Sequence, residues 1–166
     1  RVGRPRGTVE GEGMKALSLH QPWASLIAVG AKRFETRGWA TAYRGPLVIC
    51  AAKRKITRDE CDEMDAPEFL RALNVESLDE LPLGVAVCLA SLTACRSTES
   101  VVFGSDAHRI REHAFGNFAP GRFAWRLDNV RPFARPIPIK GAQGLFDVFP
   151  DERRAIEEQL SWVGVG

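Results

Sequence analysis

The sequence has no long hydrophobic run and none of the common nucleotide-binding or hydrolase motifs. No apolar stretch among its 166 residues approaches the roughly 20 residues that span a bilayer, and the Arg-rich first residues lack the apolar core of a signal peptide. We therefore expect a soluble, cytoplasmic protein that makes no membrane contact. The G-x-S-x-G elbow, the P-loop and the Rossmann fingerprint are also absent, which leaves esterase, NTPase and dehydrogenase functions without support.

The few cysteines do not form a metal-binding or disulfide pattern. Cys50, Cys61, Cys88 and Cys95 include no C-x-x-C pair, and no histidine follows them at ligand spacing. We therefore expect no structural zinc, no disulfide framework, no metal site and no cofactor.

What is present indicates one folded domain. Hydrophobic residues make up 45% and charged residues 27% of the chain, a composition that is neither disordered nor fibrous. Residues 1–13 hold four glycines, a proline and five charges, so we expect a flexible arm or a non-native leader there. Residues 14–166 are expected to form the domain, including a C-terminal helix.

Charge is distributed unevenly along the chain. Residues 32–58 carry eight basic residues and one acidic residue, whereas residues 59–80 carry nine acidic residues and one basic residue. Such asymmetry can steer a polyanion toward one side of the molecule, although a solvated surface with compensating charges is an open alternative. Arginine supplies 18 of the 23 basic residues, which favours bidentate contacts with phosphates or base edges.

The hydrophobic pattern predicts an α+β fold. Five or six short strands, separated by glycine and proline turns, favour a small β-barrel with flanking helices. Residues 83–93 are expected to form a central strand, and residues 133–139 an edge or bulged strand because of their prolines. Residues 57–72 are expected to form one helix, with Thr57 as N-cap and Glu60 completing a capping box.

The segment from Gly30 to Arg37 carries the densest group of candidate site residues. A strand beginning near Arg33 would place Arg33, Glu35 and Arg37 on one face, with Lys32 in the preceding turn. Neighbouring cations should keep Glu35 ionised, and Lys32 should stay protonated as a phosphate or oxyanion partner. An ionised glutamate beside an arginine can pair with a nucleobase edge. A surface strand with ion pairs worth under about 1 kcal/mol each is the alternative.

Two stretches of the sequence together resemble the ASCH family. The first comprises Leu17–Leu26 and the G-x-K-x-x-E-x-R pattern at Gly30, Lys32, Glu35 and Arg37; the second runs from Phe115 through Leu145. The resemblance implies a β-barrel related to the PUA fold. It also implies a cleft that includes Lys32, Glu35 and Arg37, and binding of RNA or another nucleic acid.

The resemblance also leaves an enzymatic function open. One branch of the family hydrolyses an acetyl amide on a modified cytidine with a lysine and a threonine three residues later. This sequence has Glu35 at that position, and Thr36 should face the other side of the strand. If the protein is an enzyme, such a hydrolase or a ribonuclease, we expect Lys32 and Glu35 to be the catalytic pair.

Further residues complete the candidate ligand-binding set. Trp39 lies near a turn and could stack on a base, whereas Trp23 is expected in the core. Lys53 and Arg54 follow a strand and suit phosphate contacts, and Gln143 lies in a glycine-flanked loop. The full set is Lys32, Glu35, Arg37, Trp39, Arg44, Lys53, Arg54 and Gln143. The expected partner is RNA or single-stranded nucleic acid, alone or within a transcription or translation assembly.

Overall fold

The computed structural model describes residues 13–64 and 66–162, so nearly all of the arm expected at residues 1–13 lies outside the described residues. The strands are β1 (Lys15–Leu19), β2 (Phe34–Arg37), β3 (Gly45–Ala51), β4 (Val85–Ser97), β5 (Phe123–Pro138) and β6 (Leu145–Asp147). The helices are α1 (Trp23–Ala28), α2 (Arg58–Glu63), α3 (Ala66–Leu73), α4 (Asp106–Phe115) and α5 (Pro150–Trp162). Short 3₁₀ turns lie at Leu78–Glu80 and Thr98–Ser100.

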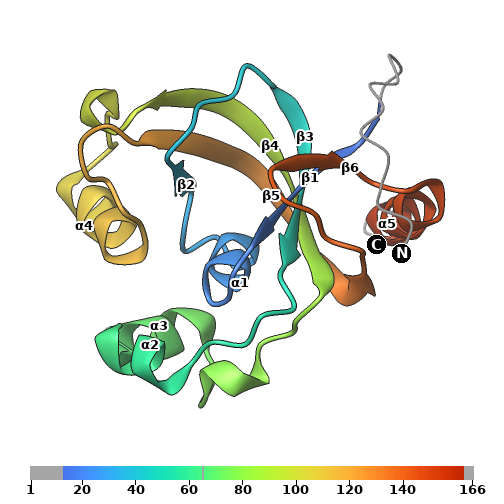
Figure 1. The fold of residues 1–166 in the computed structure, drawn as a ribbon, viewed down its shortest axis with the longest axis horizontal. Coiled ribbons are helices and arrows are strands. Elements are labelled where there is room, and N and C mark those ends of the chain that lie inside the picture. Colours follow the sequence, from blue (N-terminus) through green and yellow to red (C-terminus); the bar gives the residue numbers. More distant parts are fainter. Residues whose placement is uncertain (1–12, 65, 163–166) are drawn as a thin grey trace.

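The six strands form one sheet in the order β2-β5-β4-β3-β1-β6, which curls into a half-barrel (Figure 1). All strand pairs are antiparallel except β1 and β3, which run parallel and end at the same edge. The expected central strand is β4, which pairs with β3 on one side and β5 on the other. The α+β prediction, a curled sheet with flanking helices, is therefore confirmed.

Alternating side chains divide the sheet between two hydrophobic cores. Leu17 and Leu19 of β1 point to the core under α1, where they meet Ile27. Ala16, which precedes Leu17 and points to the opposite face, belongs to the core under α5, where Ile156 is fully buried. The period of two in the sequence thus places α1 on one face and α5 on the other.

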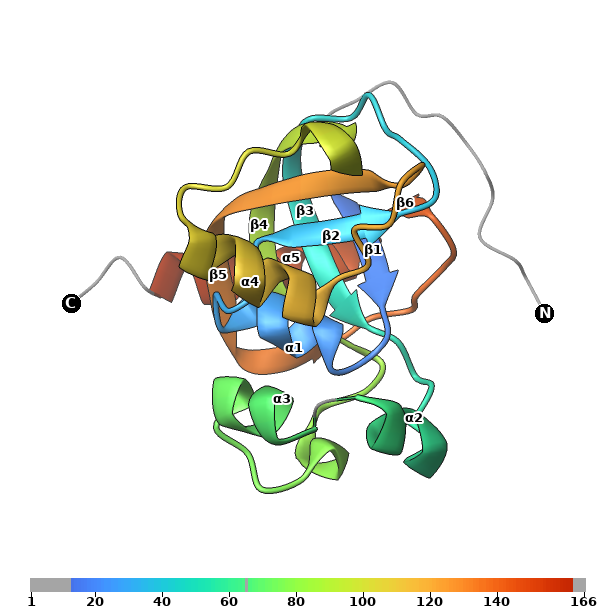
Figure 2. The ribbon, with the colours of Figure 1, turned by 90° about the vertical axis from the view of Figure 1, so that its left-hand side faces the viewer.

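The helix expected at residues 57–72 is two helices, which is a correction to the sequence prediction. Thr57 forms the expected capping box with Glu60 and starts α2. The backbone turns extended at Met64, and α3 begins again at Ala66 with Pro67 in its first turn, where proline is tolerated. Figure 2 shows α2 and α3 side by side beneath α1, where Phe69 packs in a third core with Leu26.

The strand expected at residues 133–139 is the second part of one long strand, β5, which begins at Phe123. Asn129 adopts a positive φ of 51° within β5, and the strand continues to Pro138. The register with β4 shifts at three places along this pairing. The segment from Pro132 onward pairs only with β4, so the expectation of an edge or bulged strand is correct there.

No helix among the described residues is long and apolar enough to cross a bilayer.

Candidate functional site

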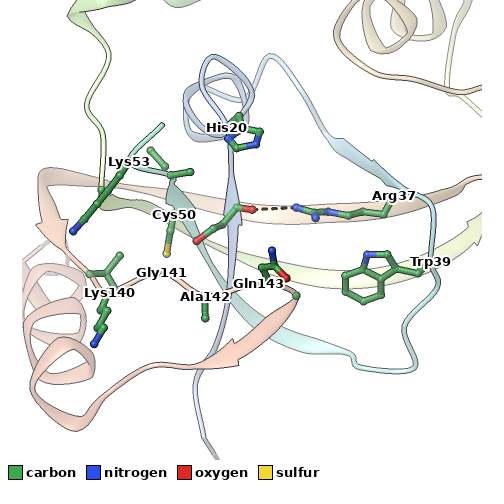
Figure 3. Close-up of a pocket in the computed structure, with 15 residues that line it drawn as sticks. His20, Arg37, Trp39, Cys50, Lys53, Lys140, Gly141, Ala142 and Gln143 are labelled. Atoms are coloured by element: carbon green, nitrogen blue, oxygen red, sulfur yellow. Dashed lines mark hydrogen bonds between the residues drawn. The ribbon is translucent and has the colours of Figure 1, made fainter. Parts of the chain in front are cut away.

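A cavity of about 760 Å³ opens where the chain leaves the parallel strands β1 and β3. Its walls come from the ends of β1, β2 and β3, from Gly84 before β4, and from the loop 139–144 after β5. Figure 3 shows Arg37 and Trp39 on one side of this cavity and Lys53 and Lys140 on the other. The carboxyl ends of adjacent parallel strands meet at one edge, and here they create the largest hollow of the site.

Two smaller cavities extend this hollow into a longer groove. A cavity of about 330 Å³ shares Ser18, His20, Arg37 and Trp39 with the first. A cavity of about 450 Å³ shares Trp23, Glu35, Thr36 and Arg122 with the second and continues to Lys32 and the end of α4. We call the three together the groove. It runs from Lys140 at one end to Phe115 at the other.

The Lys32, Glu35 and Arg37 side chains meet inside the groove. Lys32 Nζ lies 4.0 Å from Glu35 Oε2, and Arg37 Nε lies 3.5 Å from Glu35 Oε1. Lys32 is 1% exposed, and its Nζ donates a 2.8 Å hydrogen bond to the Phe115 carbonyl. The alternation in β2 leaves Glu35 and Arg37 half-buried, whereas Phe34 and Thr36 are buried.

Burial changes the expected charge behaviour of this pair. Loss of water contact raises the pKa of the Glu35 carboxyl, against the opposing influence of Lys32, Arg37 and Arg122. Burial also lowers the pKa of Lys32, although Glu35 and Glu112 favour its charged form. The sequence led us to expect fully ionised groups because it shows neighbouring charges and not the loss of solvent.

Arg33 does not belong to this cluster. It precedes β2 and its side chain is exposed, so it does not flank Glu35 as the strand pattern suggested. Its backbone N–H, however, donates a 2.7 Å hydrogen bond to Glu112 Oε1.

Glu112 is a buried residue next to the site, and sequence reasoning did not select it. It is fully buried on α4 and also accepts a 3.2 Å hydrogen bond from the Phe34 N–H. His108 Nε2 lies 3.3 Å from its Oε1. Because one carboxylate binds two consecutive N–H groups at the start of β2, it fixes the strand that carries Glu35 and Arg37. A glutamate in a charged helix is normally a surface residue, so sequence alone carries no signal of this role.

Two tryptophans line the groove. Trp39 is 39% exposed, and its ring meets the Trp125 ring edge-on at 4.6 Å between centroids. The Trp125 indole N–H donates to the Trp39 carbonyl, so both ring and backbone are held. Trp23 packs against the core as expected, but it is only half-buried and also lines the two smaller cavities.

The remaining candidate residues divide into two groups. Lys53 and Gln143 line the large cavity. Arg44 and Arg54 line none of the three cavities. The Arg44 guanidinium donates to the Thr41 and Tyr43 carbonyls, and Arg54 pairs with Glu60 of α2. These local contacts hold both arginines away from the groove.

Two buried polar atoms in the groove have no hydrogen-bond partner within the part of the chain that the structure describes. These are Ser18 Oγ and Arg37 Nε, although the other end of the Arg37 guanidinium donates to the Ser18 carbonyl at 3.1 Å. An unsatisfied buried polar group costs about 1–3 kcal/mol, so such atoms are uncommon away from binding sites. Both atoms lie in residues that line the large cavity.

No three His, Cys, Asp or Glu side chains are grouped as metal ligands in the described part of the chain. The polar groups of the groove include cations, two carboxylates, two hydroxyls, two amides and two indole rings. Such a set can hold an anion at the cations and a flat polar group between carboxylate, arginine and indole.

Comparison with known proteins gives sequence relatives and structural relatives. Activating signal cointegrator 1 from Homo sapiens is 40% identical over 131 residues, which cover 78% of this chain and 21% of the relative. The Mus musculus protein of that name is 39% identical over the same shares. The chain thus spans about a fifth of the length of these curated relatives.

The fold is similar to that of the ASCH protein from Zymomonas mobilis. Its crystal structure aligns with a TM-score of 0.50 at 17% identity, covering 88% of this chain and 94% of that chain. A variant of the same protein aligns with a TM-score of 0.51 and covers 89% and 98%. Residues 17–136 match the ASCH domain family, a span that contains most of the sheet and the whole Lys32, Glu35 and Arg37 cluster. The chain therefore belongs to the ASCH domain family.

Proposed function

We propose that this protein binds RNA or single-stranded nucleic acid and holds one nucleotide of it in the groove. One observation carries the proposal: the half-buried Glu35–Arg37 pair lies next to a cation-lined cavity. Trp39, which is half-exposed, lines the groove where the two meet. Bases stack on such rings for about 1–3 kcal/mol each, and phosphates bind the cations.

Glu35 and Arg37 have complementary capacities toward a base edge. The carboxylate accepts from amino or imino groups, whereas the guanidinium donates to ring oxygens or nitrogens. Arg37 Nε is buried without a hydrogen bond, and it is a donor that a base acceptor would satisfy. Single-stranded nucleic acid is favoured over duplex because a base must leave its stack to reach a groove of this depth.

A titration followed by NMR tests this proposal. Adding a ten-nucleotide single-stranded RNA of mixed sequence to the ¹⁵N-labelled protein should shift the Trp39 indole and Gln143 side-chain signals. The backbone signals of residues 157–161 in the second half of α5, which line none of the three cavities, serve as the internal control and should stay in place. Shifts confined to these control signals, or no shifts at millimolar RNA, would contradict the proposal.

A second candidate is hydrolysis of a modified nucleoside or of RNA in the same groove. It is favoured by the Lys32–Glu35 pair, since burial raises one pKa and lowers the other, bringing an acid and a base toward the same pH range. The Thr36 hydroxyl accepts a 3.2 Å hydrogen bond from the Asn117 N–H, and Thr36 lines the same cavity as Lys32 and Glu35.

Acylated nucleosides and end-labelled RNA incubated with the pure protein separate these candidates. Turnover that Lys32→Met abolishes, in a variant that keeps the wild-type melting temperature, would establish the enzyme. Binding without turnover would leave the groove as a recognition site.

A further inference from the structure

The large cavity has a strongly one-sided charge. Among the described residues, its lining contains three cations, Arg37, Lys53 and Lys140, and no carboxylate. The α4 end of the groove is balanced in charge, because Glu35 and Glu63 line it together with Lys32 and Arg122. An anionic group would therefore be attracted more strongly to the large cavity than to the other end.

The two lysines are brought together by backbone hydrogen bonds around Gly84. The Gly84 N–H donates to the Ala51 carbonyl at 2.9 Å, and the Ile139 N–H donates to the Gly84 carbonyl at 3.4 Å. Lys53 lies two residues beyond Ala51, and Lys140 follows Ile139. Strand ends that are distant in sequence thus place two ammonium groups at one rim of the cavity.

The local structure supports these positions. The Lys53 stem crosses Gly84 so closely that a Cβ there would lie 2.9 Å from its Cγ, and Gly84 has a φ of +68°. The Lys140 N–H is bound at 2.8 Å by Glu152 Oε2 of α5. Neither lysine side chain has an intramolecular hydrogen bond or ion pair among the described residues. Both charges are therefore available to a ligand.

The middle of the cavity contains hydrogen-bonding groups that are not paired with other described residues. Ser18 Oγ is buried without a partner and lies directly beneath Gly141, where a Cβ would approach it to 2.8 Å. The Gln143 side-chain amide makes no hydrogen bond with another described residue. Lys53 and Lys140 lie on the side opposite Arg37 and Trp39, with Gln143 between them (Figure 3).

We propose that Lys53 and Lys140 form a phosphate subsite, so that a nucleotide lies across the cavity with its phosphate at the lysines and its base at Arg37 and Trp39. The inference rests on the proposed function and deepens it. It orients the ligand, and it identifies two cations, Lys53 and Lys140, that lie outside the Lys32, Glu35 and Arg37 cluster. The recognised chemistry is a phosphate ester, either the diester of a strand or the monoester of a free nucleotide.

The salt dependence of binding tests the subsite. A fluorescein-labelled ten-nucleotide RNA is titrated with the full-length protein at several salt concentrations, for wild type, Lys53→Ala, Lys140→Ala and the double variant. Each substitution should reduce the log–log salt slope by about 0.7, and the double variant by about twice that. Lys55→Ala is the matched control, because Lys55 is exposed, carries the same charge and lines none of the cavities. An unchanged slope in the double variant, or an equal loss in Lys55→Ala, would overturn the subsite.

A second probe separates failure of the subsite from failure of the proposed function. Uridine 5′-monophosphate and inorganic pyrophosphate are titrated into ¹⁵N-labelled wild type and double variant, with the Gly141 and Gly144 amides as reporters. Shifts that are present in wild type and lost in the double variant support the subsite. If RNA does not bind but these shifts are seen, only the proposed function fails. Competition by the monophosphate would identify a free nucleotide as one source, whereas RNA binding with no monophosphate shift would identify the strand diester. The inference would be overturned if the double variant bound RNA, the monophosphate and pyrophosphate in the same way as wild type.

Discussion

Glu35 lies between two cations, yet burial dominates its environment. The side chain is 12% exposed, and loss of water contact is the strongest influence on its pKa, exceeding the attraction of Lys32 and Arg37. A carboxyl whose pKa rises on folding binds more protons in the folded state than in the unfolded state. Its contribution to stability is therefore present below the ordinary value of 4.5 and declines as the pH rises through the raised pKa.

The pH dependence of unfolding tests this balance. The free energy of unfolding of wild type minus that of Glu35→Gln should fall as the pH rises from 4.5 toward neutrality, because only wild type loses the proton. Urea unfolding at several pH values measures this difference. Glu158→Gln on α5 serves as control for a carboxyl outside the groove. A difference that grows with pH would show that the ion pairs to Lys32 and Arg37 outweigh burial.

Glu112 has a structural role that reaches the groove. It accepts the N–H groups of Arg33 and Phe34, and an amide in its place offers one acceptor atom in place of two. We expect Glu112→Gln to lower the free energy of unfolding by about 2–3 kcal/mol, because a buried N–H loses a charged acceptor. Chemical denaturation measures the loss, with Glu158→Gln changing stability by no more than about 0.5 kcal/mol. Equal stability of the two variants would mean that Glu112 does not anchor β2.

At the scale of elements, α2 explains why neighbouring basic residues have different roles. Glu60 closes the capping box with Thr57 and also pairs with Arg54, and these bonds lower its pKa to about 2. Arg54 is therefore committed to the helix start, whereas Lys53 one residue earlier lines the cavity. The sequence shows a single basic run and does not separate the two.

The titration of Glu60 tests its pairing with Arg54. Its carboxyl resonance should have a midpoint near pH 2 in wild type and shift toward 4.5 in Arg54→Ala, since the first cause of the low pKa is removed. The capping box needs the ionised Glu60 carboxylate. It is therefore fully formed above pH 4.5 and is lost as the pH falls through about 2. An unshifted midpoint in Arg54→Ala would contradict the pairing.

Local patterns predicted most elements, and the failures have physical causes. The N-cap at Thr57, the central strand β4 and the proline-rich edge of β5 follow from capping, burial and proline chemistry that act within a few residues. The strand expected at residues 133–139 begins ten residues earlier, at Phe123, because pairing with β4 carries β5 through the positive φ of Asn129. Tertiary pairing of this kind has no local signal.

The candidate site was predictable only where the family resemblance marked it. Lys32, Glu35 and Arg37 meet because their spacing lies within one turn and strand. Glu112 and Lys140 join the groove through contacts between elements that are distant in sequence, about 80 residues apart for Glu112 and β2. No pattern inside α4 or the loop 139–144 distinguishes these residues from ordinary charged surface residues.

At the scale of the whole molecule, the fold places the charge asymmetry of the sequence across the groove. The segment from Asp59 to Glu80 forms α2, α3 and the turn after them, beneath α1 (Figure 2). The cations of the large cavity come from β2, from the residue after β3 and from the loop after β5. A polyanion is thus favoured at the large cavity over the α4 end of the groove, where Glu35 and Glu63 balance Lys32 and Arg122, and this difference gives binding a direction as well as a position.

The most direct test of the groove as a base-recognition site is the affinity of Glu35→Gln for three ligands. These are single-stranded oligonucleotides of the preferred base, the same length of another base, and a polyphosphate without bases. We expect discrimination between the two bases to fall by about 1–3 kcal/mol, because the acceptor between Lys32 and Arg37 is lost. Polyphosphate affinity should be kept or should rise, since one negative charge has been removed. An equal change for all three ligands would contradict base recognition by Glu35 and Arg37.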